Sequence, residues 1–291
     1  MTRKQLEQVV VSGGGIGGLA AALACTKRGV SVQLIERAAQ LSEVGAGIQI
    51  GPNVTRILQA WGLGDALAQV AAFPERLQAR DAQTGQVLGS LRLGQRAQAV
   101  YGAPYATIHR ADLQNLLHAA ARAEGVPVRL GQTVQGWRET SGGVQVNTAD
   151  GHSVQADALI GADGVWSAVR QQLLGDAPAR FTGHLAYRAL VAQADLPAQL
   201  RTDEVTVWMG PHLHVVHYPV RRGLWLNVGA IVHGDGPALA DAWDAHGHAQ
   251  ALMQAMGAVG ADLHARLASV PAWRQWALHD RAPMASAHEM A

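Results

Sequence analysis

The chain has little cysteine and no long apolar run. Cys25 is the only cysteine, so an internal disulfide is excluded and a reducing compartment is expected. No apolar stretch approaches the ~20 residues of a membrane helix. The N-terminal residues 1–7 lack the apolar segment of a secretory signal. These absences predict a soluble cytoplasmic protein with no membrane partner.

An excess of charge of one sign is also lacking. The sequence has 23 basic and 22 acidic residues, which gives no electrostatic case for binding nucleic acid. Apolar residues make up 48% of its 291 positions. That is enough for a large core, in either one large domain or two.

The first part of the chain alternates strands and helices. Residues 8–11 form a short apolar run typical of a buried parallel strand, glycines follow, and an alanine-rich helix is predicted over 16–28. A second strand over 30–36 completes a βαβ unit. After Gly175 the pattern favours an antiparallel sheet followed by helices. Its strands are predicted at 185–192, 205–209, 213–218 and 224–232, and its helices at 238–256 and 261–267.

A glycine-rich turn joins the first strand to the first helix. In Gly13-x-Gly15-x-x-Gly18 the first glycine permits the tight turn, the second lets backbone approach a pyrophosphate, and the third allows close helix–strand packing. Glu36 ends the second strand, where a carboxylate accepts hydrogen bonds from a ribose hydroxyl. The motif predicts dinucleotide binding, against the alternative of a structural turn, but it does not separate FAD from NAD. The predicted site also includes Gly17 and Arg37.

A second motif follows the strand predicted at 158–161. Taken singly, Asp163-Gly164 is a turn and Ser167 a helix N-cap. The whole string Ile160-Gly161-Ala162-Asp163-Gly164-x-x-Ser167-x-x-Arg170 resembles the second fingerprint of the FAD-dependent aromatic hydroxylases with the p-hydroxybenzoate-hydroxylase-like fold. The resemblance implies that Asp163 and Gly164 lie near the flavin pyrophosphate and help guide the nicotinamide cofactor.

Further segments carry the same resemblance, which spans about residues 8–283. The loop 45–53, with Gly47, is similar to the loop beside the flavin ring. His109-Arg110-Ala111-Asp112-Leu113 is similar to the helix start whose arginine, here Arg110, contacts FAD. The implied fold is α/β, with a Rossmann-type FAD-binding domain and an interleaved antiparallel-sheet substrate domain.

The resemblance also implies domain limits. Residues 1–180 are expected to form the FAD domain, with the hairpin 76–93 on the substrate side, and residues 181–277 the substrate domain. Residues 278–291 are expected to be a truncated return to the FAD domain, because the family's C-terminal Gly-Asp motif is not present. We therefore expect weak or absent FAD retention and poor solubility.

A polar row is predicted on one strand of the later sheet. His212, His214, Val216 and Tyr218 share one face, while His217 points to the other, so three histidines are not expected to form a metal site.

This segment is similar to that of 3-hydroxybenzoate 6-hydroxylases and their salicylate-hydroxylase siblings, in which a histidine and a tyrosine four residues apart contact the substrate phenol. The resemblance assigns these roles to His214 and Tyr218, and a base that polarises the phenol suits hydroxylation. The alternative is that both hydrogen-bond only inside the sheet. Tyr105 and Arg188 are weaker substrate candidates, and His246 and His248 are read as surface residues of a helical stretch.

The function implied by the resemblance is an FAD-dependent monooxygenase that uses NADH or NADPH and O2 through a flavin C4a-hydroperoxide. Its first expected substrate is 3-hydroxybenzoate, converted to gentisate. Salicylate hydroxylation with decarboxylation to catechol is the second. An inactive homologue and a pyridine-nucleotide dehydrogenase stay open, as do the choice of nicotinamide cofactor and a homodimer.

Overall fold

The computed structural model describes residues 6–41, 46–175, 177–235 and 245–283. Contacts divide the chain into two units, each assembled from separated segments. Unit 1 comprises residues 1–43, 114–180 and 279–291, and unit 2 comprises 44–113 and 181–278. The hairpin predicted at 76–93 lies in unit 2, together with the rest of residues 44–113.

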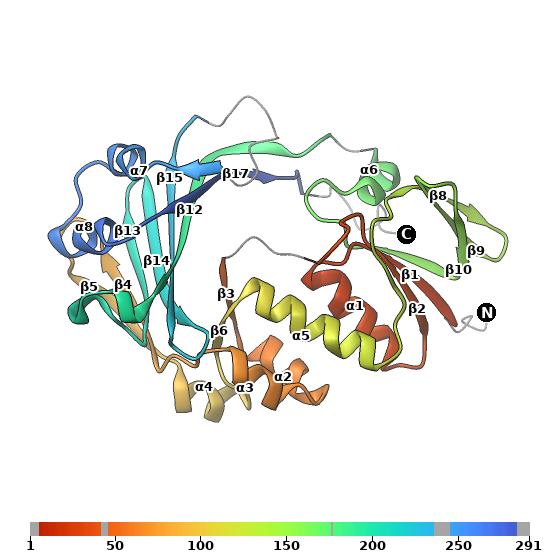
Figure 1. Ribbon diagram of the computed structural model, residues 1–291, viewed down its shortest axis with the longest axis horizontal. Coiled ribbons are helices and arrows are strands. Elements are labelled where there is room, and N and C mark those ends of the chain that lie inside the picture. Colours follow the sequence, from red (N-terminus) through yellow and green to blue (C-terminus); the bar gives the residue numbers. More distant parts are fainter. Residues whose placement is uncertain (1–5, 42–45, 176, 236–244, 284–291) are drawn as a thin grey trace. The chain divides into compact units, whose positions relative to one another are not determined.

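Unit 1 is built on a parallel sheet with strand order β11-β1-β2-β7. The strands are β1 (Gln8–Ser12), β2 (Ser31–Ile35), β7 (Val128–Arg129) and β11 (Ala158–Gly161). Helix α1 (Ile16–Thr26) connects β1 to β2 and packs on this sheet (Figure 1). Gly29 follows the helix with a φ of +79°, which only glycine adopts readily. The predicted βαβ unit is therefore confirmed, with its ends within two residues.

A small antiparallel sheet completes unit 1. It consists of β8 (Val134–Thr140), β9 (Gly143–Thr148) and β10 (Ser153–Ala156), in the order β10-β9-β8. Its buried valines share one apolar cluster with Val10, Ile35 and Val169, the last of which lies on α6 (Ala168–Leu174). Helix α5 (Arg110–Ala123) enters unit 1 at Gln114.

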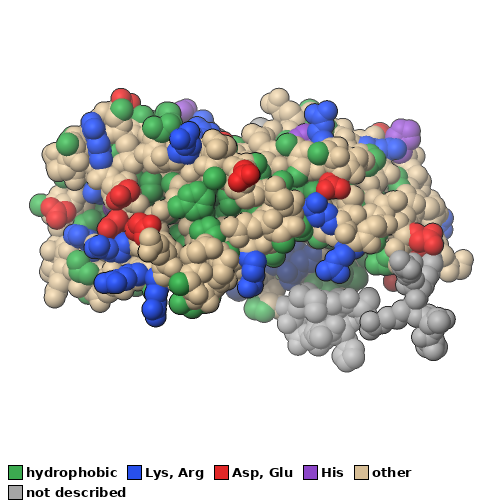
Figure 2. Space-filling model, turned by 90° about the horizontal axis from the view of Figure 1, so that it is seen from below, with side chains coloured by type: hydrophobic (Ala, Val, Ile, Leu, Met, Phe, Trp, Pro, Cys, Tyr) green, Lys and Arg blue, Asp and Glu red, His purple; other side chains and the backbone are tan. Residues whose placement is uncertain are grey.

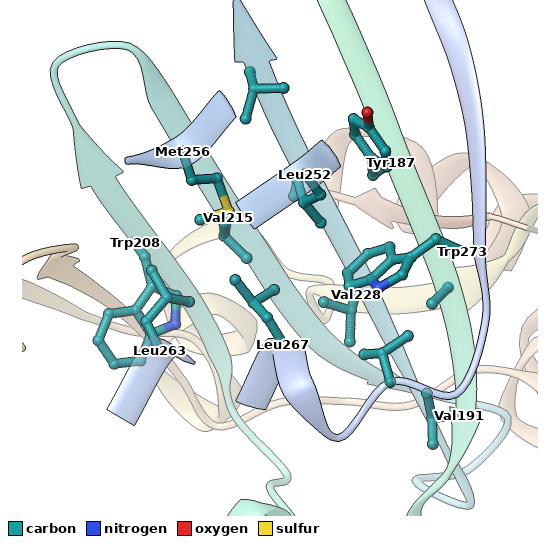
Figure 3. Packing of buried hydrophobic residues seen from close by; sticks show 14 of the residues in the cluster. Tyr187, Val191, Trp208, Val215, Val228, Leu252, Met256, Leu263, Leu267 and Trp273 are labelled. Carbon is teal, nitrogen blue, oxygen red and sulfur yellow. The ribbon is translucent and has the colours of Figure 1, made fainter. Parts of the chain in front are cut away.

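Unit 2 is built on an eight-stranded sheet of order β16-β17-β12-β15-β14-β13-β4-β5. Its strands are β4 (Arg76–Asp81), β5 (Val87–Arg92), β12 (Arg180–Ala192), β13 (Val205–Gly210), β14 (Leu213–Val220), β15 (Trp225–His233), β16 (Ala245–Gly247) and β17 (Trp273–Asp280). The helices α7 (Ala249–Met256) and α8 (Ala261–Ala268) cover one face, and their leucines pack against Trp208, Val215 and Trp273 (Figure 3). The opposite face of the sheet is not covered by α7 or α8.

A short two-stranded sheet and three helices complete the described part of unit 2. Strands β3 (Gly47–Ile50) and β6 (Ala106–His109) pair antiparallel. The helices are α2 (Pro52–Ala60), α3 (Gly64–Val70) and α4 (Gly94–Tyr101). The sequence pattern did not indicate β3, β6, α3 or α4.

One secondary-structure prediction is wrong. The alanine-rich segment 238–256 was expected to be one helix, but among its described residues 245–247 form β16 and 249–256 form a helix. Strand β16 pairs with β17, which was also not predicted from the sequence, so tertiary pairing overrides local helix propensity here. Residues 238–244 lie outside the described residues. His246 and His248 are exposed, as predicted, although neither is in a helix.

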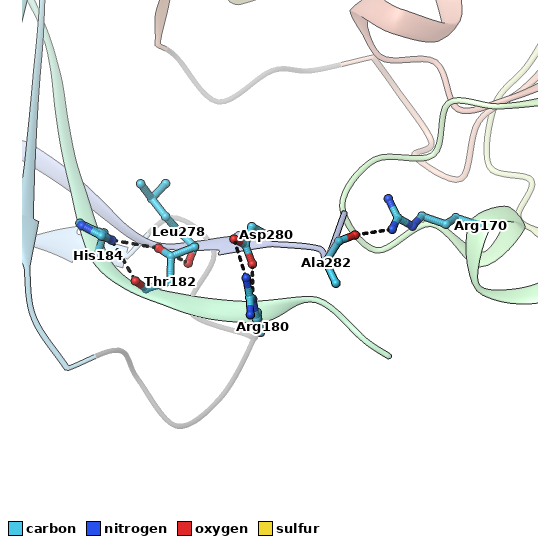
Figure 4. Close-up of polar contacts among 7 residues, drawn as sticks. All are labelled: Arg170, Arg180, Thr182, His184, Leu278, Asp280 and Ala282. Carbon is cyan, nitrogen blue, oxygen red and sulfur yellow. Dashed lines mark hydrogen bonds and ion pairs between the residues drawn. The ribbon is translucent and has the colours of Figure 1, made fainter. Parts of the chain in front are cut away.

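The described residues after β17 are held within unit 1 by polar contacts. The guanidinium of Arg180 is 2.7 Å from the carboxylate of Asp280, and Arg170 donates to the carbonyl of Ala282 at 2.8 Å (Figure 4). Arg281 donates to the Val165 carbonyl at 2.7 Å. The bond from Arg281 ties the segment to the loop that contains Asp163-Gly164.

The surface agrees with the balanced composition. On the face that Figure 2 shows, acidic and basic side chains are interspersed rather than gathered by sign. Among the described residues, we find no helix with both the length and the apolar character needed to cross a membrane.

Candidate functional site

The glycine turn in unit 1 is shaped by close backbone packing. Gly13 has a φ of +109°, and a Cβ there would overlap the carbonyl of Ala162 after β11. A Cβ on Gly18 would overlap the carbonyl of Gly13. Both positions therefore require glycine.

Two further glycines of the turn, Gly15 and Gly17, face open space. A Cβ at Gly15 or Gly17 would meet no atom within 4 Å. Gly15 is the N-cap of α1, where no side chain caps the helix and no acidic residue lies in the first turn. A helix N-terminus left open in this way accepts a phosphate through its amides and its partial positive charge. The residues present therefore fit the pyrophosphate of a dinucleotide.

Two side chains hold the turn in place. The Glu36 carboxylate accepts the Gly14 amide at 2.5 Å and the Ala38 amide at 2.7 Å. Gln114 on α5 is buried and donates from Nε2 to the Gly14 carbonyl at 3.0 Å. The predicted bond from Glu36 to a ribose stays a prediction, as do the roles of Arg37 and Gly17. Gln114 was not predicted, although a polar residue beside Leu113 on the buried side of α5 could have indicated it.

Asp163 caps the helix that follows it. Its carboxylate accepts the Ser167 hydroxyl at 2.5 Å and the amides of Ala168 and Val169 at 2.9 and 3.2 Å. Ser167 is the N-cap of α6, as predicted, and accepts the Arg170 amide at 2.9 Å. Gly164 has a φ of +82°. The motif thus fixes a turn and a helix start, and its part in cofactor binding stays a prediction.

The predicted polar row lies on the face of the unit 2 sheet opposite α7 and α8. Val215 belongs to the apolar cluster beneath these helices, whereas Val216 and Tyr218 belong to a separate cluster on the other side. His217 is buried near Trp208, so it points away from His214, as the period-2 pattern predicted. His214 is exposed and Tyr218 is 4% exposed.

Tyrosines and arginines converge near Tyr218. Burial raises the pKa of Tyr218, and the charges of Arg188 and Arg110 partly oppose this. Burial also raises the pKa of Tyr105 to about 12, and its hydroxyl donates to the Gln49 side chain. Both phenols therefore stay protonated at neutral pH and act as hydrogen-bond donors rather than as bases.

Arg188 has an aromatic partner. Its guanidinium carbon lies 3.9 Å from the ring centroid of Trp276 on β17, a cation–π geometry that orients a planar cation. The structure thus brings Arg188, Arg110 and Tyr105 around Tyr218, all within unit 2.

Gly47 and Asp112 also contact residues of β14, of β15 and of the turn after β14. The Gly47 amide donates to the Asn227 side chain at 2.6 Å, and a Cβ at position 47 would lie 2.5 Å from the Tyr218 ring. Asp112 receives two bonds from Arg221, at 2.8 and 3.1 Å. Arg221 has a φ of +51° in the turn after β14, so this pair holds a strained turn. Gly45, in the same predicted flavin loop as Gly47, lies outside the described residues.

His214 lies at the end of the polar row opposite to Tyr218. Partial burial lowers its pKa, and the proximity of His184 adds to this effect. At about 3.3 Å per residue, its Cα is roughly 13 Å along β14 from that of Tyr218, so a ligand touching both must bridge the gap. Across residues 6–41, 46–175, 177–235 and 245–283, no set of three or more His, Cys, Asp or Glu side chains is arranged to hold a metal ion.

Comparison with known proteins identifies the family. The FAD binding domain family matches residues 7–222. The chain belongs to this family. The match includes the glycine turn, the DG motif and the row from His214 to Tyr218. The α/β fold and the FAD cofactor inferred from the resemblance are thereby confirmed.

Individual relatives agree with this assignment. The chain is 37% identical over 279 residues to the 3-hydroxybenzoate 6-hydroxylase of Klebsiella oxytoca, covering 95% of this chain and 69% of that protein. It is 38% identical to the enzyme of the same name from Polaromonas naphthalenivorans, covering 95% and 68%. A salicylate hydroxylase in complex with substrate has a similar structure, with a TM-score of 0.79, 27% identity, and coverage of 96% and 70%.

Proposed function

We propose that this chain is a flavin-dependent monooxygenase that hydroxylates 3-hydroxybenzoate para to its phenol, giving gentisate. The observation that carries the proposal is the polar face of unit 2, where His214 and Tyr218 lie four residues apart on β14, with Arg188 and Arg110 near Tyr218. Relatives named 3-hydroxybenzoate 6-hydroxylase support it. FAD, when reduced by NADH or NADPH and exposed to O2, supplies the oxygen that is transferred.

Residues of this chain activate the phenol, orient the substrate and bind the FAD. His214 accepts the proton of the phenol, which makes the ring richer in electrons and more reactive towards an electrophilic oxygen. Tyr218, protonated and buried, donates a hydrogen bond that orients the substrate. Arg188, whose guanidinium lies over the Trp276 ring, pairs with the carboxylate. Gly13, Gly15 and Gly18 hold the FAD pyrophosphate, while Gly47 and Arg110 are proposed to line the flavin side of unit 2.

The second candidate is salicylate 1-hydroxylation with loss of CO2, favoured by the structural likeness to a salicylate hydroxylase. The two substrates differ in the separation of phenol and carboxylate, which is ortho in salicylate and meta in 3-hydroxybenzoate. The relatives named 3-hydroxybenzoate 6-hydroxylase favour the meta arrangement. We also propose a cytoplasmic location, because the reaction uses NAD(P)H. The proposed homodimer is tested by measuring the molecular mass of the FAD-loaded chain in solution.

Product analysis tests the proposal. The purified chain, loaded with FAD, is given NADH or NADPH and either 3-hydroxybenzoate or salicylate, and the products are separated. We expect gentisate from the first and slower or no catechol from the second. Faster catechol formation would favour the salicylate reaction. NAD(P)H oxidation that neither aromatic acid stimulates would contradict both.

A further inference from the structure

The side chain of Asn227 links the large sheet of unit 2 to the strand that begins at Gly47. Asn227 lies on β15 and is 3% exposed. Its Oδ1 accepts the Gly47 amide at 2.6 Å. In the register of the sheet it is opposite Tyr218 on β14, so the two side chains share the polar face. Asn227 was not predicted from the sequence as a site residue.

Gly47 is enclosed by these two side chains. A Cβ at Gly47 would lie 2.8 Å from Cγ of Asn227, 2.5 Å from Cε2 of Tyr218 and 2.9 Å from the Tyr218 hydroxyl oxygen. The hydroxyl proposed to contact substrate is therefore beside the Gly47 backbone. A buried N–H without an acceptor is costly, so the bond to Asn227 fixes where this backbone lies.

The backbone around Gly47 also holds the start of α5. The Arg110 amide donates to the Ala46 carbonyl at 2.8 Å, and Gly47 pairs with His109 across β3 and β6. The positions of Gly47 and Arg110 are therefore coupled through the backbone. A separate bond, from the Thr107 hydroxyl to the Pro219 carbonyl, joins β6 to β14. Loss of the Asn227 amide should consequently shift Gly47 without detaching these strands from the large sheet.

We propose that Asn227 is a positioning residue that sets the separation between Tyr218, on the substrate side, and Gly47 and Arg110, on the flavin side. This inference rests on the proposed function, in which these three residues contact substrate and FAD. Oxygen transfer is sensitive to such a separation, because a misplacement of about 1 Å can cost about a hundredfold in rate. When transfer fails, the hydride of NAD(P)H and one proton reduce O2 to hydrogen peroxide, and no C–O bond forms.

Two substitutions separate the hydrogen bond from the volume of the side chain. Asn227→Leu keeps a similar volume but removes the acceptor. Asn227→Asp keeps an oxygen that can accept the Gly47 amide, whether its carboxyl is ionised or protonated. The matched control is Thr206→Val, because Thr206 is buried on β13 and is paired with His217, which lies on the opposite face of the sheet from Tyr218.

Two measurements are made on these chains. In the FAD-free chains, NMR follows the exchange of the Gly47 amide hydrogen with solvent. In the FAD-loaded chains, gentisate and hydrogen peroxide are measured for each NAD(P)H oxidised in the presence of 3-hydroxybenzoate. A role limited to stability would change the amount of folded chain but not the ratio of these two products.

We expect the Gly47 amide to exchange at least about tenfold faster in Asn227→Leu and to stay protected in Asn227→Asp and Thr206→Val. The share of NAD(P)H oxidation that yields gentisate should fall in Asn227→Leu alone. A Gly47 amide that exchanges like an exposed amide in the unmodified chain would overturn the proposal without any variant. An unchanged gentisate share in Asn227→Leu would also overturn it. Failure of the proposed function is distinguishable, because 3-hydroxybenzoate would then not stimulate NAD(P)H oxidation even in the unmodified chain.

Discussion

Gly47 lies directly against the ring of Tyr218. A Cβ on Gly47 would be 2.5 Å from Cε2 of Tyr218 and 2.8 Å from Cγ of Asn227. The Gly47 amide also donates to the Asn227 side chain. Position 47, predicted from resemblance to line the flavin, therefore also sets the position of the tyrosine proposed to bind substrate. Because Gly47 has no side chain, the ring of Tyr218 has room to lie against its backbone.

Replacing Gly47 by alanine should displace Tyr218. Overpacking of this kind costs about 1–3 kcal/mol, so we expect a lower free energy of unfolding together with weaker 3-hydroxybenzoate binding. Urea unfolding and ligand titration measure the two effects. The matched control is Gly89→Ala on β5, where a Cβ would meet no atom within 4 Å. A Gly47→Ala chain as stable as the Gly89→Ala chain would contradict the contact.

Two substitutions in the glycine turn should separate an effect on stability from an effect on FAD binding. Gly15→Ala places a methyl group in open space at the start of α1, so we expect a stability change of about 1 kcal/mol or less but at least tenfold weaker FAD binding. Gly18→Ala overlaps the Gly13 carbonyl and should destabilise the chain by at least about 3 kcal/mol even without FAD. Unfolding of the FAD-free chains and fluorescence titration with FAD test both. Equal stability losses in the two variants would refute the distinction.

Tyr218→Phe removes the hydroxyl and keeps the ring. A hydrogen bond to a charged group contributes about 1.5–3 kcal/mol, so binding of 3-hydroxybenzoate should weaken by about tenfold to a hundredfold. The control is Tyr187→Phe, because Tyr187 is buried on the other face of the sheet beside Trp273. Isothermal titration of the FAD-loaded chains gives both affinities. Similar affinities in the two variants would show that the Tyr218 hydroxyl does not contact substrate.

Local features of the fold could be predicted from the sequence. The strand, glycine turn and helix at 8–26 follow from apolar period and glycine placement, both of which act between neighbouring residues. The separation of His217 from His214 follows from the two-residue period of a strand. Ser167 as a helix N-cap is equally local.

Contacts between distant segments could not be predicted in this way. The packing of Gly47 on Tyr218 depends on how β3 and β14 are placed in unit 2, which no local pattern encodes. The contact between the rings of His184 and His233 requires the register of β12 against β15, and a shift of one residue would turn His184 to the other face. Residues 245–247 form a strand because they pair with β17, which would otherwise be the edge of the sheet.

The buried His217 should make stability depend on pH. Its ring is 2% exposed, and neither ring nitrogen has a hydrogen-bond partner among the described residues. Burial lowers its pKa well below the ordinary value, and the positive charges of Arg266 and Arg80 add to this. The unfolded chain therefore binds a proton near pH 6.5 while the folded chain does not. By linkage, the free energy of unfolding should fall as pH drops below about 6.5 and continue to fall until the folded pKa is reached.

Urea unfolding at pH 7.5, 6.5 and 5.5 measures this contribution. His217→Gln removes the titrating group, so the loss of stability between pH 7.5 and 5.5 should be smaller than in the unmodified chain, whatever the stability of the variant at pH 7.5. His264→Gln serves as the control, because His264 is exposed on α8. Its stability should follow the unmodified chain at every pH. The same pH dependence in the His217 and His264 variants would mean that His217 is protonated in the folded chain, despite its burial beside two arginines.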